Sequence, residues 1–191
     1  MRLIIFILLS SLWLTGCIVF DKKSTSVNFY QLSAPAASPQ KDSPIIFVPR
    51  AQIPSSLRRP NLVLSEEKGE LSLNDNTRWV SPLDRAISET IARNITLNTL
   101  LPTTTQTPSG DHFVLLIDVS EFNLGRQGAT LHLSYRLETD KGDLIKQGYG
   151  KWENKANDDP ASLVKAQSIN LANAAAEISQ VIINHTPAPV R

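Results

Sequence analysis

Apolar and polar residues form three strand-like runs in the second half of the chain. Residues 129–138 place an apolar side chain at every second position, and residues 112–120 are almost continuously apolar. Continuous runs are typical of central strands, so we expect 112–120 to be covered on both faces. Turn sequences at 125–128 and 140–143 separate these runs from a third, at 144–152. This order predicts an antiparallel meander of three strands.

Two other segments carry apolar residues at helical spacing. The first helix is predicted over about 82–100, with Ser81 as its N-cap and Pro82 at its first position. Its apolar stripe consists of aliphatic residues four positions apart: Leu83, Ile87, Ile91 and Ile95. The second helix is predicted to begin at Asp159-Pro160 and to run to about residue 183.

The first half of the chain holds shorter β-prone runs. Strands are predicted at 27–33 and 45–48, and a hairpin at 62–64 and 70–73, after which the polar residues 74–76 should break the chain. The whole pattern predicts a single α/β (α+β) domain. Its sheet should be mixed but mostly antiparallel, with the meander at its C-terminal side and two main helices packed on it.

The N-terminus has the pattern of an exported lipoprotein. Arg2 precedes an apolar stretch, which ends in a sequence that resembles the bacterial lipobox: Leu14, Thr15, Gly16 and Cys17. The Cys17 thiol is the nucleophile that would accept a diacylglycerol, and small residues before it would let the backbone enter a protease cleft. The alternative is an uncleaved membrane anchor over residues 3–20, a length close to the minimum for a span.

Four parts of the chain follow from this interpretation. Residues 1–16 are expected to be a signal peptide, 17–26 a lipid-anchored tether, 27–184 the folded domain and 185–191 a flexible tail. Ile18 stands where inner-membrane lipoproteins usually have an aspartate. We therefore expect a lipid anchor in the outer membrane of a Gram-negative bacterium, with the domain facing the periplasm.

Composition excludes several kinds of protein. Lysine and arginine number 19 against 18 acidic residues, a net charge of +1, so no global basic field favours nucleic acid. The one cysteine cannot form an internal disulfide.

Arg58 and Arg59, with Arg50 and Lys68 nearby, are candidates for contact with lipid phosphates or nucleic acid. A solvated loop is the more common role for so short a basic run.

Catalytic chemistry has little support in the sequence. His132 falls on a polar strand face and in no nucleophile or HExxH motif, which indicates an exposed sheet residue. Asp118 interrupts an apolar strand and is expected to be a buried, hydrogen-bonded structural acid. Phosphate-binding glycine loops and metal-ligand clusters are absent from the sequence. We therefore predict a protein that is not an enzyme and has no metal or cofactor.

Several short motifs nevertheless occur in a specific order. After the lipobox come Phe29-Tyr30-Gln31-Leu32-Ser33, Val48-Pro49, Leu57-Arg58-Arg59-Pro60-Asn61-Leu62-Val63 and Arg78-Trp79-Val80-Ser81-Pro82-Leu83. Together they resemble the ABC-type transport auxiliary lipoproteins of the PqiC type. The matching positions, carried over one by one, are Tyr30, Leu32, Pro49, Arg59, Pro60, Trp79, Pro82 and Leu83.

This resemblance implies a non-enzymatic component of an MCE-type lipid transport system. Its partners would be an MCE-domain protein with its ABC transporter and permease, and it would itself be a homo-oligomer. Most matching positions look architectural, with Trp79 and Leu83 anchoring the first helix to the sheet, whereas Arg59 and Pro60 are the candidate partner contact. The alternative is another outer-membrane assembly lipoprotein, such as a cell-wall-synthase activator or a lipopolysaccharide-export partner.

Overall fold

The computed structural model describes residues 25–40, 43–66 and 70–186. The predicted signal peptide, Cys17 and most of the tether lie outside these ranges, as do Lys68 and residues 187–191. Within the described ranges, none of the helices has the length and apolar character needed to cross a membrane.

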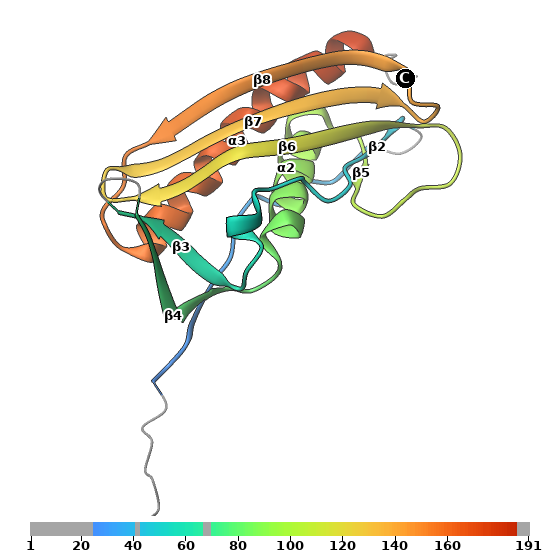
Figure 1. Ribbon diagram of the computed structural model, residues 1–191. Coiled ribbons are helices and arrows are strands. Elements are labelled where there is room, and N and C mark those ends of the chain that lie inside the picture. Colours follow the sequence, from blue (N-terminus) through green and yellow to red (C-terminus); the bar gives the residue numbers. More distant parts are fainter. Residues whose placement is uncertain (1–24, 41–42, 67–69, 187–191) are drawn as a thin grey trace, which may run out of the picture.

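In the described residues, the domain consists of eight strands and two α-helices (Figure 1). The first-half elements are β1 (Asn28–Tyr30), β2 (Ile45–Phe47), the short 3₁₀ helix η2 (Ser55–Leu57), β3 (Asn61–Ser65) and β4 (Leu71–Trp79). They are followed by α2 (Leu83–Thr99), β5 (Thr103–Thr104), β6 (His112–Gly125), β7 (Gly128–Thr139), β8 (Leu144–Asn154) and α3 (Pro160–His185). The predicted fold class, a mixed sheet with two main helices in one α+β domain, is confirmed.

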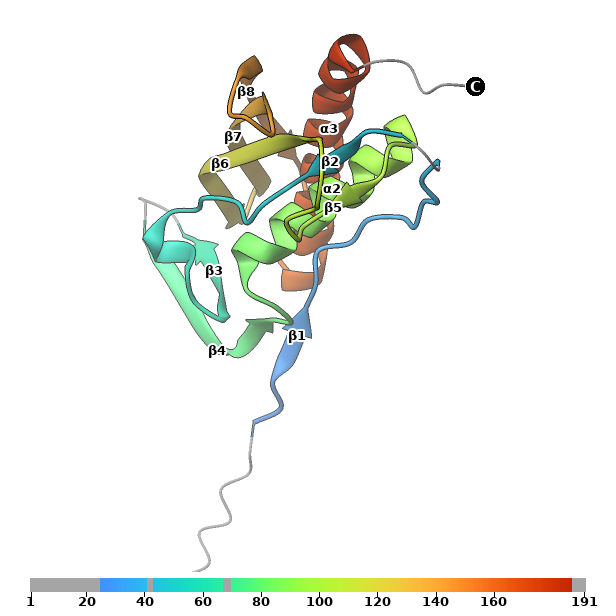
Figure 2. The same cartoon turned by 90° about the vertical axis from the view of Figure 1, so that its right-hand side faces the viewer.

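The long strands β6, β7 and β8 form the predicted antiparallel meander. Alternation along β7 matches the sequence pattern, since Ala129, Leu131, Leu133 and Leu137 are buried. Figure 2 shows both helices on one side of these strands. No described helix covers the other face of β6, and Asp118 on it is exposed rather than buried. The prediction that this strand is covered on both faces was therefore wrong, because both helices pack on the same side of the sheet.

One continuous stretch of chain follows the other edge of β6. β2 pairs with the start of β6 in parallel, Gln52 bridges to Asp118, and Ser65 of β3 pairs with Gly125 at its end. The Gln52 backbone exchanges hydrogen bonds of 2.8 and 2.9 Å with β6. This stretch fixes the position of η2 and of the arginines around it relative to the sheet.

β4 continues through the residues that were predicted to break it. Val63 pairs with Leu73, and Asn61 pairs with Arg78, so that residues 74–77 stand opposite only one residue of β3. The polar residues therefore form a bulge inside a strand instead of ending it. The last residues of β4 also pair in parallel with β1, which keeps the strand continuous as far as Trp79.

The two helices begin differently. Asp159 caps α3 as predicted, and its carboxylate accepts a hydrogen bond from the Ser162 amide at 2.9 Å. Ser81 does not cap α2, because Pro82 itself occupies the N-cap position and its carbonyl accepts from the Arg85 and Ala86 amides. The α3 helix runs to His185, which had been assigned to the tail.

The core lies between the helices and the meander. The predicted stripe of α2 is buried throughout: Leu83, Ile87, Ile91 and Ile95. On α3, buried Asn170 donates to the Ala129 carbonyl at 3.0 Å and accepts from Asn154 at 2.6 Å. This polar network fixes α3 against the paired ends of β7 and β8, because each group would lose a hydrogen bond in any other register.

Candidate functional site

An open groove lies where the chain passes from the β3–β4 hairpin into α2. Its volume is about 430 Å³, within the range of small-molecule sites. Its walls come from the loop around η2, the end of β4 and the start of α2: Arg50, Ile53, Arg58, Arg59, Pro60, Trp79, Val80, Ser81, Pro82, Leu83 and Asp84. Several of the residues that carry the sequence motifs therefore meet at one place.

Trp79 forms the rigid wall of the groove. Only 6% of its surface is exposed, and its ring meets Phe122 of β6 edge-on, with centroids 6.1 Å apart. Its amide donates to the Pro60 carbonyl at 2.7 Å, which joins the arginine loop to the end of β4. Leu83, four residues further along the chain at the start of α2, is also buried.

The charge of the groove is positive. Arg50 lies 3.7 Å from the Asp84 carboxylate, the one acid in the lining. Arg58 and Arg59 are exposed and form no ion pair with any described residue. Three arginines against one aspartate leave a local surplus of two positive charges, twice the surplus of the whole chain. This concentration of charge favours an anionic partner or ligand.

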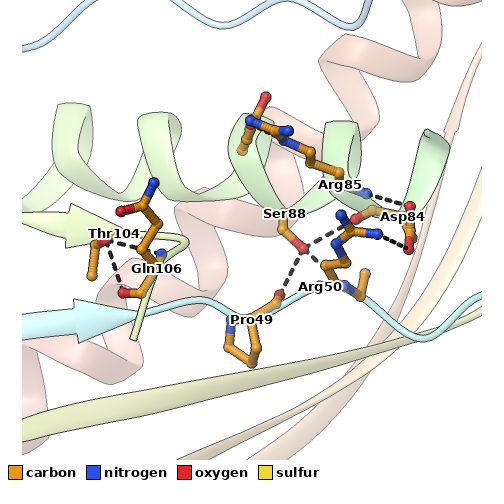
Figure 3. A network of polar contacts seen from close by, with 9 residues as sticks. Pro49, Arg50, Asp84, Arg85, Ser88, Thr104 and Gln106 are labelled. Carbon is orange, nitrogen blue, oxygen red and sulfur yellow. Dashed lines mark hydrogen bonds and ion pairs between the residues drawn. The ribbon is translucent and has the colours of Figure 1, made fainter. Parts of the chain in front are cut away.

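Buried Ser88 holds the Arg50 segment against α2 (Figure 3). Its hydroxyl accepts from the Ala51 amide at 2.8 Å and lies 2.8 Å from the Pro49 carbonyl and 3.1 Å from that of Asp84. The Asp84 carboxylate also accepts from the Arg85 amide at 2.8 Å. These contacts set the Arg50 backbone beside the helix start, so one wall of the groove is preorganised.

The remaining motif residues support the groove from behind or lie away from it. The Tyr30 carbonyl accepts from the Val80 amide at 2.9 Å, which ties β1 to the groove wall. Leu32 is buried in the core and does not line the groove. Sequence reasoning did not assign Ile53, Val80 or Asp84 to a site, although two of them adjoin motif residues.

A second polar cluster lies on the uncovered face of the meander. His132 Nδ1 lies 3.0 Å from the Glu121 carboxylate, and Lys151 pairs with Glu153 at 2.5 Å. The Lys151 hydrogen bond and charge lower the pKa of Glu153. His132 is half-buried, not simply exposed as predicted. Among the described residues, no group of three or more histidine, cysteine or acidic side chains is placed to hold a metal ion.

Known proteins are similar to this chain in sequence and in fold. Intermembrane transport lipoprotein PqiC of Escherichia coli (strain K12) is 25% identical over 181 residues, covering 91% of this chain and 94% of that protein. The Shigella flexneri protein of the same name gives the same values. A solved structure of an uncharacterized protein has a TM-score of 0.70 at 22% identity, covering 83% of this chain and 99% of that one.

A Xanthomonas campestris protein of known structure has a TM-score of 0.66 at 16% identity, covering 83% of this chain and 97% of that one. These two structures show the fold. The family profile described as ABC-type transport auxiliary lipoprotein component matches residues 30–179, from the Tyr30 motif to the last turns of α3. The chain therefore belongs to the ABC-type transport auxiliary lipoprotein family.

Proposed function

We propose that this protein is a lipid-anchored, non-enzymatic auxiliary component of an MCE/ABC-type intermembrane lipid transport system. Family membership and the name of its relatives, intermembrane transport lipoprotein, support the transport role. The lipobox supports a lipid on Cys17, and Ile18 supports the outer membrane. In this proposal the lipid holds one end of the protein, and the folded domain captures the transport complex from the periplasm.

The convergence of motif residues on one groove is the observation that carries the docking proposal. Arg59 and Pro60 lie exposed on its rim, while Trp79 and Leu83 are fixed in the core behind it. An exposed arginine beside a rigid, desolvated aromatic wall is typical of residues that dominate binding energy. We place the contact with the MCE-domain protein at this rim.

Capture from solubilised membranes tests the docking. The full-length protein with a C-terminal tag should recover the MCE-domain protein together with its permease and ATPase. Arg59→Glu should reduce that recovery at least about tenfold, because one reversed charge at a binding centre typically costs well over 1.4 kcal/mol. Lys146→Glu, an equal charge reversal on exposed β8, should leave recovery unchanged.

Two outcomes would sink this proposal. The wild-type protein recovering no MCE-domain protein would remove its central claim. Recovery of a cell-wall synthase or a lipopolysaccharide-export protein instead would favour the alternative class of outer-membrane lipoprotein. Genes for an MCE protein, a permease and an ATPase beside this one would distinguish the two classes without any experiment on the protein.

The lipid anchor has its own test. A Cys17→Ser variant lacks the thiol that accepts the diacylglycerol, so it should stay uncleaved and fail to reach the outer membrane. Membrane fractionation and the mass of the purified protein measure both effects. Normal processing and sorting of the variant would overturn the lipoprotein interpretation.

The native mass of the wild-type protein in detergent tests the proposed homo-oligomer in the same preparation.

A further inference from the structure

The groove has the properties of a site for one chemical class of ligand. We propose that it binds an anionic phospholipid, with the phosphate held by Arg58 and Arg59 and the glycerol and first acyl carbons lying against Pro60, Trp79 and Val80. The proposal deepens the function above by giving the folded domain a phospholipid site of its own, and it rests on that function for its biological meaning. The binding itself can be measured separately.

The two adjacent arginines are available for a phosphate. Each guanidinium presents a planar fork of donors that matches two phosphate oxygens, and each is free of described carboxylates. Arg50 lies 3.7 Å from the Asp84 carboxylate, which balances part of its charge and makes this part of the groove less favourable for an anion. The phosphate position is therefore expected at the η2 side.

Apolar side chains make up much of the remaining lining. They include Ile53, Pro60, Trp79, Val80, Pro82 and Leu83. A free inorganic phosphate would leave this surface in contact with water. A phospholipid joins an anionic group to hydrocarbon across a few atoms, so it satisfies the arginines and covers the apolar wall together.

The groove also lies at the end of the domain that carries the tether. Tyr30 of β1 is hydrogen-bonded to Val80 of the groove wall, and only ten residues lie between Cys17 and the start of β1. The eleven Cα–Cα steps from Cys17 to Asn28 span at most about 40 Å when extended, so a lipid on Cys17 would keep this end close to a bilayer. Figure 2 shows β1 and the start of α2 at the same end of the molecule.

Exposed hydrophobic side chains at this end agree with a lipid environment. Phe29 of β1 is 63% exposed and Val80 is 57% exposed. Single exposed apolar residues are common, but these two lie on paired backbone segments next to an arginine-rich groove. Aromatic and aliphatic side chains next to arginines are the combination that binds the interface of an anionic membrane.

Tryptophan fluorescence can measure the binding. The full chain, purified from its membrane in non-ionic detergent with Trp152→Phe, leaves Trp79 as the reporter inside the folded domain. Titration with dihexanoylphosphatidylglycerol should give a saturable change in its emission. Arg58→Gln with Arg59→Gln should weaken the affinity at least about tenfold. Arg85→Gln with Arg93→Gln removes two charges from α2 outside the groove and should leave the affinity unchanged.

Two further ligands identify the source of the phosphate. Dihexanoylphosphatidylcholine, whose headgroup has no net charge, should bind more weakly than dihexanoylphosphatidylglycerol. Inorganic phosphate should bind most weakly of the three. Equal binding of inorganic phosphate and the lipid would overturn the proposal, because the apolar wall would then contribute nothing. Unchanged lipid affinity in the Arg58 and Arg59 variant would overturn it as well.

The docking and lipid proposals fail in different ways. Loss of partner capture in Arg59→Glu, together with no saturable lipid binding by the wild type, would make the groove a protein contact and reject the lipid proposal alone. Saturable lipid binding that depends on Arg58 and Arg59, together with no recovery of any MCE-domain protein, would reject the transport partner and keep the lipid site.

Discussion

Removal of the buried Ser88 hydroxyl should show how much the segment at the groove wall depends on its hydrogen bonds for stability. Ser88 is 1% exposed, and its oxygen is the acceptor for the Ala51 amide at 2.8 Å. In Ser88→Ala the Ala51 amide keeps a contact with the Asp84 carbonyl at 3.4 Å, a distance near the upper limit for a hydrogen bond. The Pro49 carbonyl loses a polar neighbour in the same change.

The expected loss follows from these contacts. A buried donor without a good acceptor costs about 1–3 kcal/mol. The long contact to Asp84 recovers part of that loss, and the half-buried Pro49 carbonyl can turn toward water. We therefore expect Ser88→Ala to lower the free energy of unfolding by about 2 kcal/mol.

A matched serine on the other helix provides the control. Ser179 is also buried, but its hydroxyl donates to the Ala175 carbonyl one turn earlier in the same helix and accepts only a long contact, 3.4 Å, from the exposed Asn98 side chain. That carbonyl keeps its helical partner, so Ser179→Ala should cost less than about 1 kcal/mol. Urea unfolding followed by circular dichroism measures the free energy of unfolding of both variants, with one common slope of that free energy against urea concentration. A loss in Ser88→Ala no larger than in Ser179→Ala would refute the role given to Ser88.

Changes at Gly150, Asn170 and Asp159 test the packing of β8 and α3 and the cap of α3. Gly150→Ala places a methyl group against the Trp152 ring and should cost about 1–3 kcal/mol, whereas an unchanged melting temperature would show that the ring moves freely. Asn170→Leu leaves several buried polar groups without partners and should cost about 2–4 kcal/mol in urea unfolding; a neutral result would contradict the network. Hydrogen bonds from Ser162 lower the pKa of Asp159 below its ordinary value of 3.8. Asp159→Ala should therefore destabilise the protein at pH values above 3.8, and its difference in stability from the wild type should vanish as the pH falls through the lower pKa of the folded state. Asp159→Asn, which cannot ionise, should show no such step in pH-dependent melting.

Much of the fold could be predicted from local patterns. Period-two alternation at 129–138 and four-residue spacing in 83–95 specify their elements, because only one face of each can be buried. The polar residues 74–76 misled the prediction, since pairing with β1 and β3 keeps β4 continuous through them. Propensity is a weak guide where neighbouring strands supply the hydrogen bonds.

The candidate site was predictable only in pieces. Arg59, Pro60, Trp79 and Pro82 could be marked from their motif, but Arg50 joins them only because Ser88 and the edge of β6 position its segment. Asp118 was misplaced for a related reason: whether the second face of β6 is covered depends on where both helices pack.

The sequence by itself determined the three-strand meander, the two main helices with their buried stripes, and the family to which the chain belongs, because periodicity and motifs are local and ordered along the chain. Tertiary structure alone decided which segments meet. The loop at 53–60, the end of β4 and the start of α2 form one positively charged groove through backbone pairing between residues far apart in sequence. Those pairings depend on the packed core, which no single segment specifies.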